Sequence, residues 1–285
     1  MQLKKIFFPI GGGEELAERI HGALLVNKFF GTHINIMACQ LDPKMIYNVR
    51  MTLKGGVLME EFLKSAGDEM RAEREEIKAI FDAECAKLGL DQNDDDHVPN
   101  SAALRHMVGI RSELVEKYSK YCDLVLVSVP PTGAITGTFE AAVTKSGKPC
   151  IVIPRKLKEF KADKILVSLT GTAASARALD NWLELLQRAK SVTVITANHY
   201  LQEGIPETKR RISDYLALHD VKIDVFETLN ADGKIPGQVL LEYAADAGDF
   251  DLIVAGLHSD SGIKEIFLGG ASKYFLQKTK IPVLM

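Results

Sequence analysis

The chain of 285 residues contains the same pattern twice. An apolar run at residues 5–10 is followed by three glycines, and a second run at residues 164–169 is followed by Thr170-Gly171-Thr172. Farther along each half, an Asp-Leu pair opens another apolar run, at residues 123–128 and at residues 251–255. Two copies with the same order of segments, each of domain length, predict two copies of one fold.

Each half alternates short apolar runs with amphipathic segments. This alternation predicts a parallel sheet that helices cover on both faces. Strands are expected at residues 5–10, 34–39, 102–108, 123–129 and 149–153, and again at residues 164–169, 191–197, 221–227, 251–255 and 281–285. Helices are expected at residues 14–29, 57–88, 111–121 and 137–146, and again at residues 173–188, 206–218, 236–247 and 263–278.

A charged linker at residues 154–161 separates a first domain, residues 1–154, from a second domain, residues 162–285. The fold class that follows is α/β, with two tandem domains that each contain a five-stranded parallel sheet of Rossmann-like type. The closing strands at 149–153 and 281–285 are short and apolar, as edge strands are. Left bare, such edges invite pairing with another strand.

Composition excludes several classes of partner. The formal net charge is −3 and no basic cluster stands out, so neither nucleic acid nor a membrane surface is expected as a partner. No apolar segment is long enough to span a bilayer. The four cysteines, at positions 39, 85, 122 and 150, lack the spacing of a metal site or a disulfide framework, so we expect a reducing cytoplasm and no metal.

In such sheets, ligands bind beyond the carboxyl ends of the strands at the topological switch point. In the second half, that point lies between Thr170-Gly171-Thr172 and the glycine-rich segment 256–272, which includes His258. Glycine N–H groups and a helix start could hold an anion there. The alternative is that these glycines serve only turns and packing, and that Thr172 is a helix N-cap.

These residues resemble the universal stress protein family over both halves. Members that bind nucleotide carry V-P-x-D-G-S after the first strand, and G-x-x-G, nine residues and then G-S or G-T after the fourth. In this chain Gly256 and Gly269 match the first and last glycines, whereas Ser259 replaces the middle glycine, Gly270 replaces the hydroxyl residue and Thr170 replaces the aspartate. The resemblance implies a weakened site for ATP or AMP in the second domain and no required cofactor.

The first half departs further from the family pattern. Its aspartate position is Gly11, and Gly137-Thr138 resembles the closing G-S or G-T but lacks the nine-residue spacer. Glu14 and Glu15 would occupy the first helical turn, where two carboxylates would repel a phosphate. We therefore expect this loop to be structural, with Gly137 and Thr138 as weaker candidates for ligand binding.

Other constellations suggest no chemistry. The acidic run 94–97 lacks the spacing of a calcium loop and is expected to be solvated. His258 could contact an anion, but a loop histidine without a partner is more often solvated. Neither a nucleophile motif nor a P-loop occurs, so no catalytic residue is assigned.

Three functions follow as hypotheses. The first is a tandem universal stress protein that acts as a non-catalytic binding or regulatory module in the stress response. The second is an adenine-nucleotide-binding protein, or a slow ATP hydrolase, that uses the second-domain glycines. The third, an enzyme of another α/β class, has no positive support. The resemblance also implies that strands 149–153 and 281–285 pair across the halves as an intramolecular pseudo-dimer, and that two chains form a homodimer.

Overall fold

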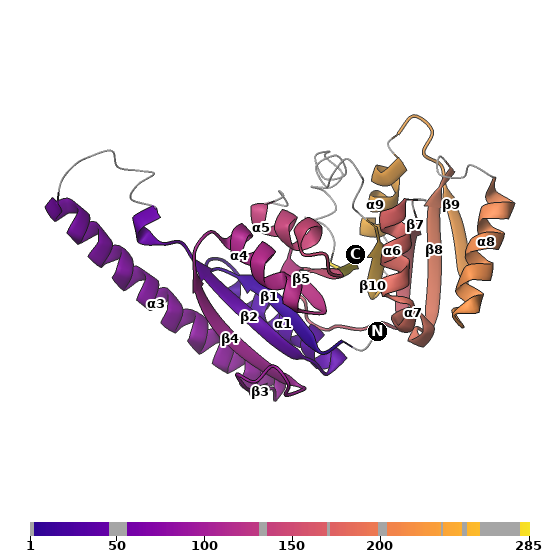
Figure 1. The fold of residues 1–285 in the computed structure, drawn as a ribbon. Coiled ribbons are helices and arrows are strands. Elements are labelled where there is room, and N and C mark those ends of the chain that lie inside the picture. The colour runs from indigo at the N-terminus through magenta and orange to yellow at the C-terminus, as the bar shows by residue number, and fades with distance from the viewer. Residues whose placement is uncertain are drawn as a thin grey trace.

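A computed structural model describes residues 3–45, 56–130, 136–169, 172–198, 204–234, 236–246, 250–256 and 280–285. Its described strands form one sheet in the order β3-β4-β2-β1-β5-β6-β11-β10-β7-β8-β9 (Figure 1). The first half contributes β1 (Lys5–Ile10), β2 (His33–Gln40), β3 (Asp91–Gln92), β4 (Ser101–Val108), β5 (Leu124–Ser128) and β6 (Cys150–Ile153). The second half contributes β7 (Lys164–Leu169), β8 (Ser191–Ala197), β9 (Val225–Leu229), β10 (Leu252–Ala255) and β11 (Val283–Leu284).

The two halves of the sheet mirror each other about its centre. Outward from the centre, the first half runs β6-β5-β1-β2-β4 and the second half runs β11-β10-β7-β8-β9. Every described strand pair within a half is parallel. The fold is thus α/β with a large, mostly parallel sheet, as predicted, and β3 adds a two-residue strand beyond the five expected in the first half.

Helices cover both faces of the sheet. The described helices are α1 (Leu16–Phe30), α3 (Gly56–Leu88), α4 (Arg111–Tyr118), α5 (Gly137–Glu140), α6 (Ala173–Asn181), α7 (Leu183–Arg188), α8 (Ile205–Leu218) and α9 (Pro236–Asp246). One apolar core contains residues of α1, α3, α6 and α7, and the other contains residues of α4, α5 and α9. Each core continues through both halves of the sheet, because burial on both strand faces leaves no break between them.

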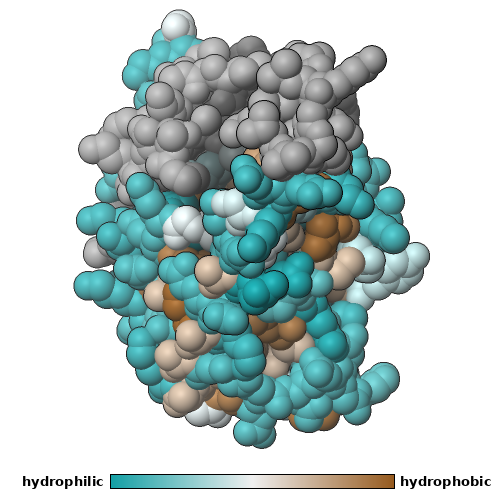
Figure 2. Space-filling model, turned by 90° about the vertical axis from the view of Figure 1, so that its left-hand side faces the viewer, coloured by the Kyte–Doolittle hydropathy of each residue, from teal (hydrophilic) through white to brown (hydrophobic). Residues whose placement is uncertain are grey.

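The long helix α3 keeps a solvated face, as the sequence predicts. Ile77 and Phe81 are buried against the sheet, whereas the charged residues between and around them are mostly exposed. Seen from the side of α3, the surface is mainly hydrophilic, and hydrophobic residues form small, separate patches (Figure 2). None of the described helices is long and apolar enough to cross a membrane.

The halves join through their closing strands. β6 and β11 pair antiparallel, with Ile151 opposite Leu284 and Val152 opposite Val283. Two reciprocal backbone hydrogen bonds extend this pairing, from Met285 N to Cys150 O at 2.8 Å and from Cys150 N to Met285 O at 3.1 Å. The expected pairing across the halves is therefore present, and it removes two bare sheet edges.

The duplication extends to individual hydrogen bonds. Asp123, just before β5, accepts from the backbone N–H groups of Lys4 and Lys5 at 2.8 and 2.9 Å. Asp251, just before β10, accepts in the same way from Asp163 and Lys164 at 3.0 and 2.8 Å. Each aspartate fastens the start of the fourth parallel strand of its half to the start of the first. We call this pair the aspartate clamps.

Three expectations differ from the structure. The helix expected at 173–188 breaks at Trp182, whose backbone leaves the helical region (ψ 12°) and whose side chain is buried. The strand expected at 221–227 begins only at Val225, because the Val221 N–H closes α8 by donating to Leu216 O at 2.9 Å. The charged linker 154–161 does not lie free in solvent, since the side chains of Leu157 and Phe160 are buried in the core.

We predict that the β6–β11 junction contributes much of the stability. Leu284 is fully buried, so Leu284→Ala should lower the free energy of unfolding by about 2 to 5 kcal/mol through lost transfer energy and a cavity. Leu218→Ala removes the same atoms from a side chain that is 81% exposed and should cost less than about 0.5 kcal/mol. Urea denaturation followed by circular dichroism measures both, and equal losses would contradict the assigned role of the junction.

We also predict that the two aspartate clamps contribute similarly and independently. Asp123→Ala and Asp251→Ala should each lower the free energy of unfolding by about 1 to 2 kcal/mol, since each removes two hydrogen bonds from backbone N–H groups to a carboxylate. The double variant should show the sum, because the clamps lie in different halves. Asp68→Ala, at a side chain that is 59% exposed, is the control. A clamp variant no weaker than this control would show that the hydrogen bonds are not stabilising.

Candidate functional site

Each half has its switch point where the sequence predicts it. β1 pairs with β5 as well as β2, and β7 pairs with β10 as well as β8. The loops after the first and fourth parallel strands of each half are therefore neighbours at the carboxyl edge of the sheet. These two crevices are the places to look for a ligand site.

In the second half, the structure brings two predicted residues together. Thr172, after β7, is the N-cap of α6, and its hydroxyl accepts a hydrogen bond from Ser175 N at 3.2 Å. Gly256, directly after β10, lies against the same first turn: a Cβ on Gly256 would overlap the backbone of Ala174 and Ser175. The predicted N-cap is confirmed, and Gly256 is needed for close packing.

Because of this packing, the presence of glycine at position 256 is not by itself evidence for a ligand. Backbone atoms cannot yield to a new Cβ as the end of a flexible side chain can, so any larger residue must shift α6 away from β10. The structural alternative considered for Gly256 thus accounts for the glycine without any ligand. The other predicted residues of this site, Thr170, Gly171, His258, Ser259, Gly269 and Gly270, lie outside the described residues.

A cavity of about 390 Å³ borders Gly256. Ala174 and Arg177 of α6 line one side of it, and the segment Gly147–Cys150 of the first half, which includes Lys148, lines another. Two cationic side chains therefore stand near the first turn of α6. This volume is within the range of small-molecule pockets, which is about 300 to 1,000 Å³.

In the first half, charged side chains of the chain itself cover the loop after β1. The Arg111 guanidinium lies where a Cβ of Gly11 would be, so Gly11 makes room for it. The Gly12 N–H donates to Glu73 Oε1 at 3.0 Å, and Glu73 Oε2 accepts from Gln40 Nε2 at 2.6 Å. A backbone donor that could have faced a phosphate is thus already used by a carboxylate.

Sequence reasoning did not find Glu73 or Arg111. Glu73 lies 61 residues from Gly12 on an exposed-looking stretch of α3, and only the fold brings the two together. Arg19 is a third charged residue at this loop, and it donates to the carbonyl oxygens of Gly11 and Gly12 at 3.2 and 3.3 Å. Desolvation and the nearby Arg155 and Arg111 lower the Arg19 pKa to about 10.

The expected place of Glu15 in the first helical turn is wrong. α1 begins at Leu16, so Glu15 is its N-cap residue and has a left-handed backbone (φ 56°). Its carboxylate pairs with Arg155 and with Lys156, the latter at 2.9 Å. Hydrogen bonds from Arg155 and Lys156 hold the Glu15 pKa below its ordinary value. The charge of Glu15 is therefore compensated by these two cations.

The weaker candidates Gly137 and Thr138 form the start of α5. Thr136 caps this short helix by accepting from Phe139 N at 3.2 Å. Gly137 faces Ser112, since a Cβ there would meet the Ser112 side chain at 3.6 Å. Residues 131–135, which join these residues to β5, lie outside the described part of the chain.

The acidic run 94–97 is not simply solvated. Asp96 accepts from the ammonium group of Lys5 and from Asn35 Nδ2, the latter at 2.9 Å, and it lies 3.3 Å from His33 Nε2. Burial favours a higher Asp96 pKa, but the hydrogen bonds from Lys5 and Asn35 outweigh it and lower the pKa. Asp96 thus ties the loop to the starts of β1 and β2. Within the described ranges, no group of three His, Cys, Asp or Glu residues could hold a metal ion.

All four cysteines are buried free thiols. Desolvation raises the pKa of Cys39 to about 11 and the pKa values of Cys85 and Cys122 to about 12, and it raises that of Cys150 as well. Because the thiolate is the reactive form, these residues are inert in the folded chain. They act as small apolar side chains, as expected for three of them from the sequence.

Comparison with known proteins supports the α/β fold described above. Residues 161–285 match the model of the universal stress protein family. No curated protein matches the chain. Among solved structures, a universal stress protein from Archaeoglobus fulgidus aligns with 98% of this chain and 94% of its own, at 13% identity and a TM-score of 0.61. Hypothetical protein MJ0577 aligns over 55% of this chain and 99% of its own, at 18% identity and a TM-score of 0.34.

The family model covers the half that holds Thr172 and Gly256, and the Archaeoglobus structure extends the likeness in fold to the first half. Residues 161–285 therefore belong to the universal stress protein family, and the chain has the fold of a universal stress protein over almost its whole length.

Proposed function

We propose that this chain is a tandem universal stress protein that acts as a non-catalytic binding or regulatory module in the stress response. Its two domains would be residues 1–154 and 162–285, each with a degenerate nucleotide site. The observation that carries this proposal is the loop after β1, which is covered by Arg111 and Glu73 of the same chain. A nucleotide could contact the backbone of Gly11 and Gly12 only after Arg111 and Glu73 move aside.

The second domain supports the proposal more weakly. Position 170 is threonine where family members that bind nucleotide have aspartate, and position 270 is glycine where they have a hydroxyl. The Thr172 hydroxyl accepts from Ser175 N, so one of its two lone pairs is committed to the helix cap. The polar groups that would recognise ribose and phosphate are thus fewer than the family pattern requires.

The alternative is an adenine-nucleotide-binding protein, or a slow ATP hydrolase, that uses the second-domain glycines to bind ATP or AMP. One observation favours it: the cavity of about 390 Å³ beside Gly256, where Arg177 and Lys148 supply positive charge. Phosphate groups would gain charge-assisted hydrogen bonds from these side chains. His258, Ser259, Gly269 and Gly270 remain its candidate contacts on sequence grounds.

The same proposal includes a cytoplasmic location and a homodimer of tandem chains. Four buried free thiols support a reducing compartment, since the protein uses none of them in a disulfide. No nucleic-acid or membrane partner is proposed, because the net charge is −3. Light scattering tests the dimer, and a purely monomeric mass would contradict it.

Isothermal titration calorimetry with ATP, ADP and AMP tests the function. We expect no binding by the wild-type chain, and we expect binding after the family pattern is restored by Thr170→Asp, Ser259→Gly and Gly270→Ser. Micromolar binding to both halves of the wild-type chain would refute the proposal, whereas binding at one site that is lost in Arg177→Gln would favour the alternative. A Gly256 variant is a poor probe, because its Cβ would displace α6.

A further inference from the structure

The Glu73 carboxylate occupies the first-half crevice in the way that a ligand anion would. Its Oε1 accepts from the Gly12 N–H at 3.0 Å, and its Oε2 accepts from Gln40 Nε2 at 2.6 Å. Gln40 ends β2 and is only 5% exposed, and its Oε1 accepts from Arg74 Nε at 2.7 Å, so the amide is held with its donor toward Glu73. We call these two converging donors the Gly12–Gln40 site.

Two guanidinium groups beside this site have no carboxylate partner among the described residues. Arg111 lies over Gly11, and none of its nitrogens donates to a described residue. Its Nε is its one nitrogen that is buried without an acceptor, so both Nη atoms keep contact with solvent. Arg19 donates to the carbonyl oxygens of Glu15, Gly11 and Gly12, which carry no full charge.

The charge around these two arginines is positive in sum. Repulsion by Arg155 and Arg111 lowers the pKa of Arg19 more than nearby carboxylates raise it. Glu73 brings one negative charge with two oxygen atoms, and both oxygens are already committed to uncharged donors. A phosphate dianion has more oxygen atoms and a second negative charge, so it could also pair with the guanidinium groups.

Glu73 can leave the Gly12–Gln40 site without unpacking the core. Between residues 60 and 76 of α3 every side chain is at least partly exposed, and the next residue, Ile77, is the first buried one after residue 60. This end of α3 projects past the sheet (Figure 1). Gly12 is partly exposed as well, so the site is open to solvent.

We propose that the Gly12–Gln40 site binds a dianionic phosphate group, and that Glu73 is an autoinhibitory occupant which this group displaces. Phosphate oxygens would accept from the Gly12 N–H and the Gln40 amide, and the remaining oxygens would pair with Arg111 and Arg19. The inference rests on the proposed function in one respect, since it assigns a small anion to the domain whose nucleotide pattern is lost.

Calorimetric titration with inorganic phosphate tests the displacement. Phosphate must compete with Glu73 in the wild-type chain, so Glu73→Ala should bind it about tenfold or more tighter. Glu73→Gln keeps the side chain without its charge and should gain less. Glu75→Ala is the matched control, because it removes the same charge from an exposed position of the same helix and should not change the affinity.

A thermal melt gives a second readout, because a ligand that binds only the folded state raises the melting temperature. Phosphate should raise that of Glu73→Ala more than that of the wild-type chain. Methyl phosphate separates two sources of the group. A gain for inorganic phosphate alone supports the free ion as ligand, and a gain for both probes supports a phosphomonoester.

Three results would each overturn the proposal: equal phosphate affinity in Glu73→Ala and the wild-type chain, an equal gain in Glu75→Ala, or a gain that survives the addition of Arg111→Gln to Glu73→Ala. Micromolar binding of ATP to both halves of the wild-type chain would instead contradict the proposed function. The two failures are therefore distinguishable.

Discussion

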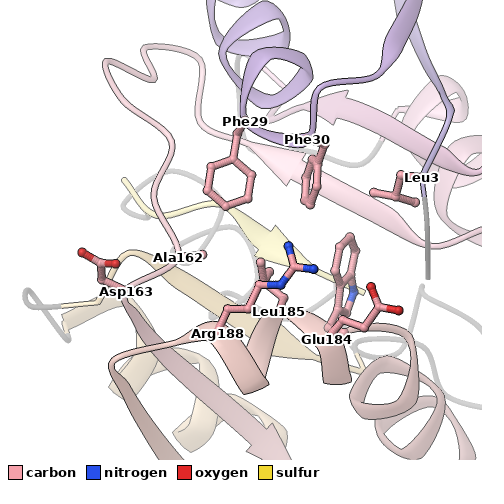
Figure 3. Close-up of a pocket in the computed structure, with 9 residues that line it drawn as sticks. Leu3, Phe29, Phe30, Ala162, Asp163, Glu184, Leu185 and Arg188 are labelled. Carbon is pink, nitrogen blue, oxygen red and sulfur yellow. The ribbon is translucent and has the colours of Figure 1, made fainter. Parts of the chain in front are cut away.

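The antiparallel pairing of β6 with β11 is the contact on which the rest of the structure depends. Every other described strand pair is parallel and lies within one half. Backbone hydrogen bonds across this one seam make a single sheet from two smaller ones, so the apolar cores on both faces pass from one half into the other. Joining the sheets also brings the end of α1 beside α7 (Figure 3), where Phe30 lies 6.3 Å from the Trp182 ring.

The two halves retain their scaffold and differ in their loops. Both aspartate clamps bind two backbone N–H groups at the start of the first strand, with distances that agree within 0.2 Å (2.8 and 2.9 Å against 3.0 and 2.8 Å). The crevices at the strand tips are unlike each other: Arg111, Glu73 and Arg19 occupy the first, whereas Gly256 packs against a capped helix in the second. The two halves thus have similar sheets but different side chains at their loops. Loops tolerate substitutions that a sheet buried on both faces does not.

The sequence predicts most elements because parallel strands buried on both faces leave long apolar runs. Strands β7 and β8 have the predicted bounds, and Thr172 caps α6 as predicted. The predictions are wrong where tertiary contacts override the local sequence pattern. Burial of Trp182 breaks a helix, and closure of α8 by Val221 delays β9. The contacts of Gly12 with Glu73 and of Gly256 with α6 join distant segments, so no local sequence signal reveals them. The other six predicted residues of the second-domain site lie outside the described residues.

The burial of all four cysteine thiols has a consequence for chemical damage. Cys39, Cys85, Cys122 and Cys150 are each at most 4% exposed, and their raised pKa values keep them as thiols. Peroxides and alkylating reagents attack thiolates that they can reach, and the folded chain offers them neither charge nor access at these positions. Modification must await opening of the packed core around each thiol, so the rate of cysteine labelling would report how often the folded state opens.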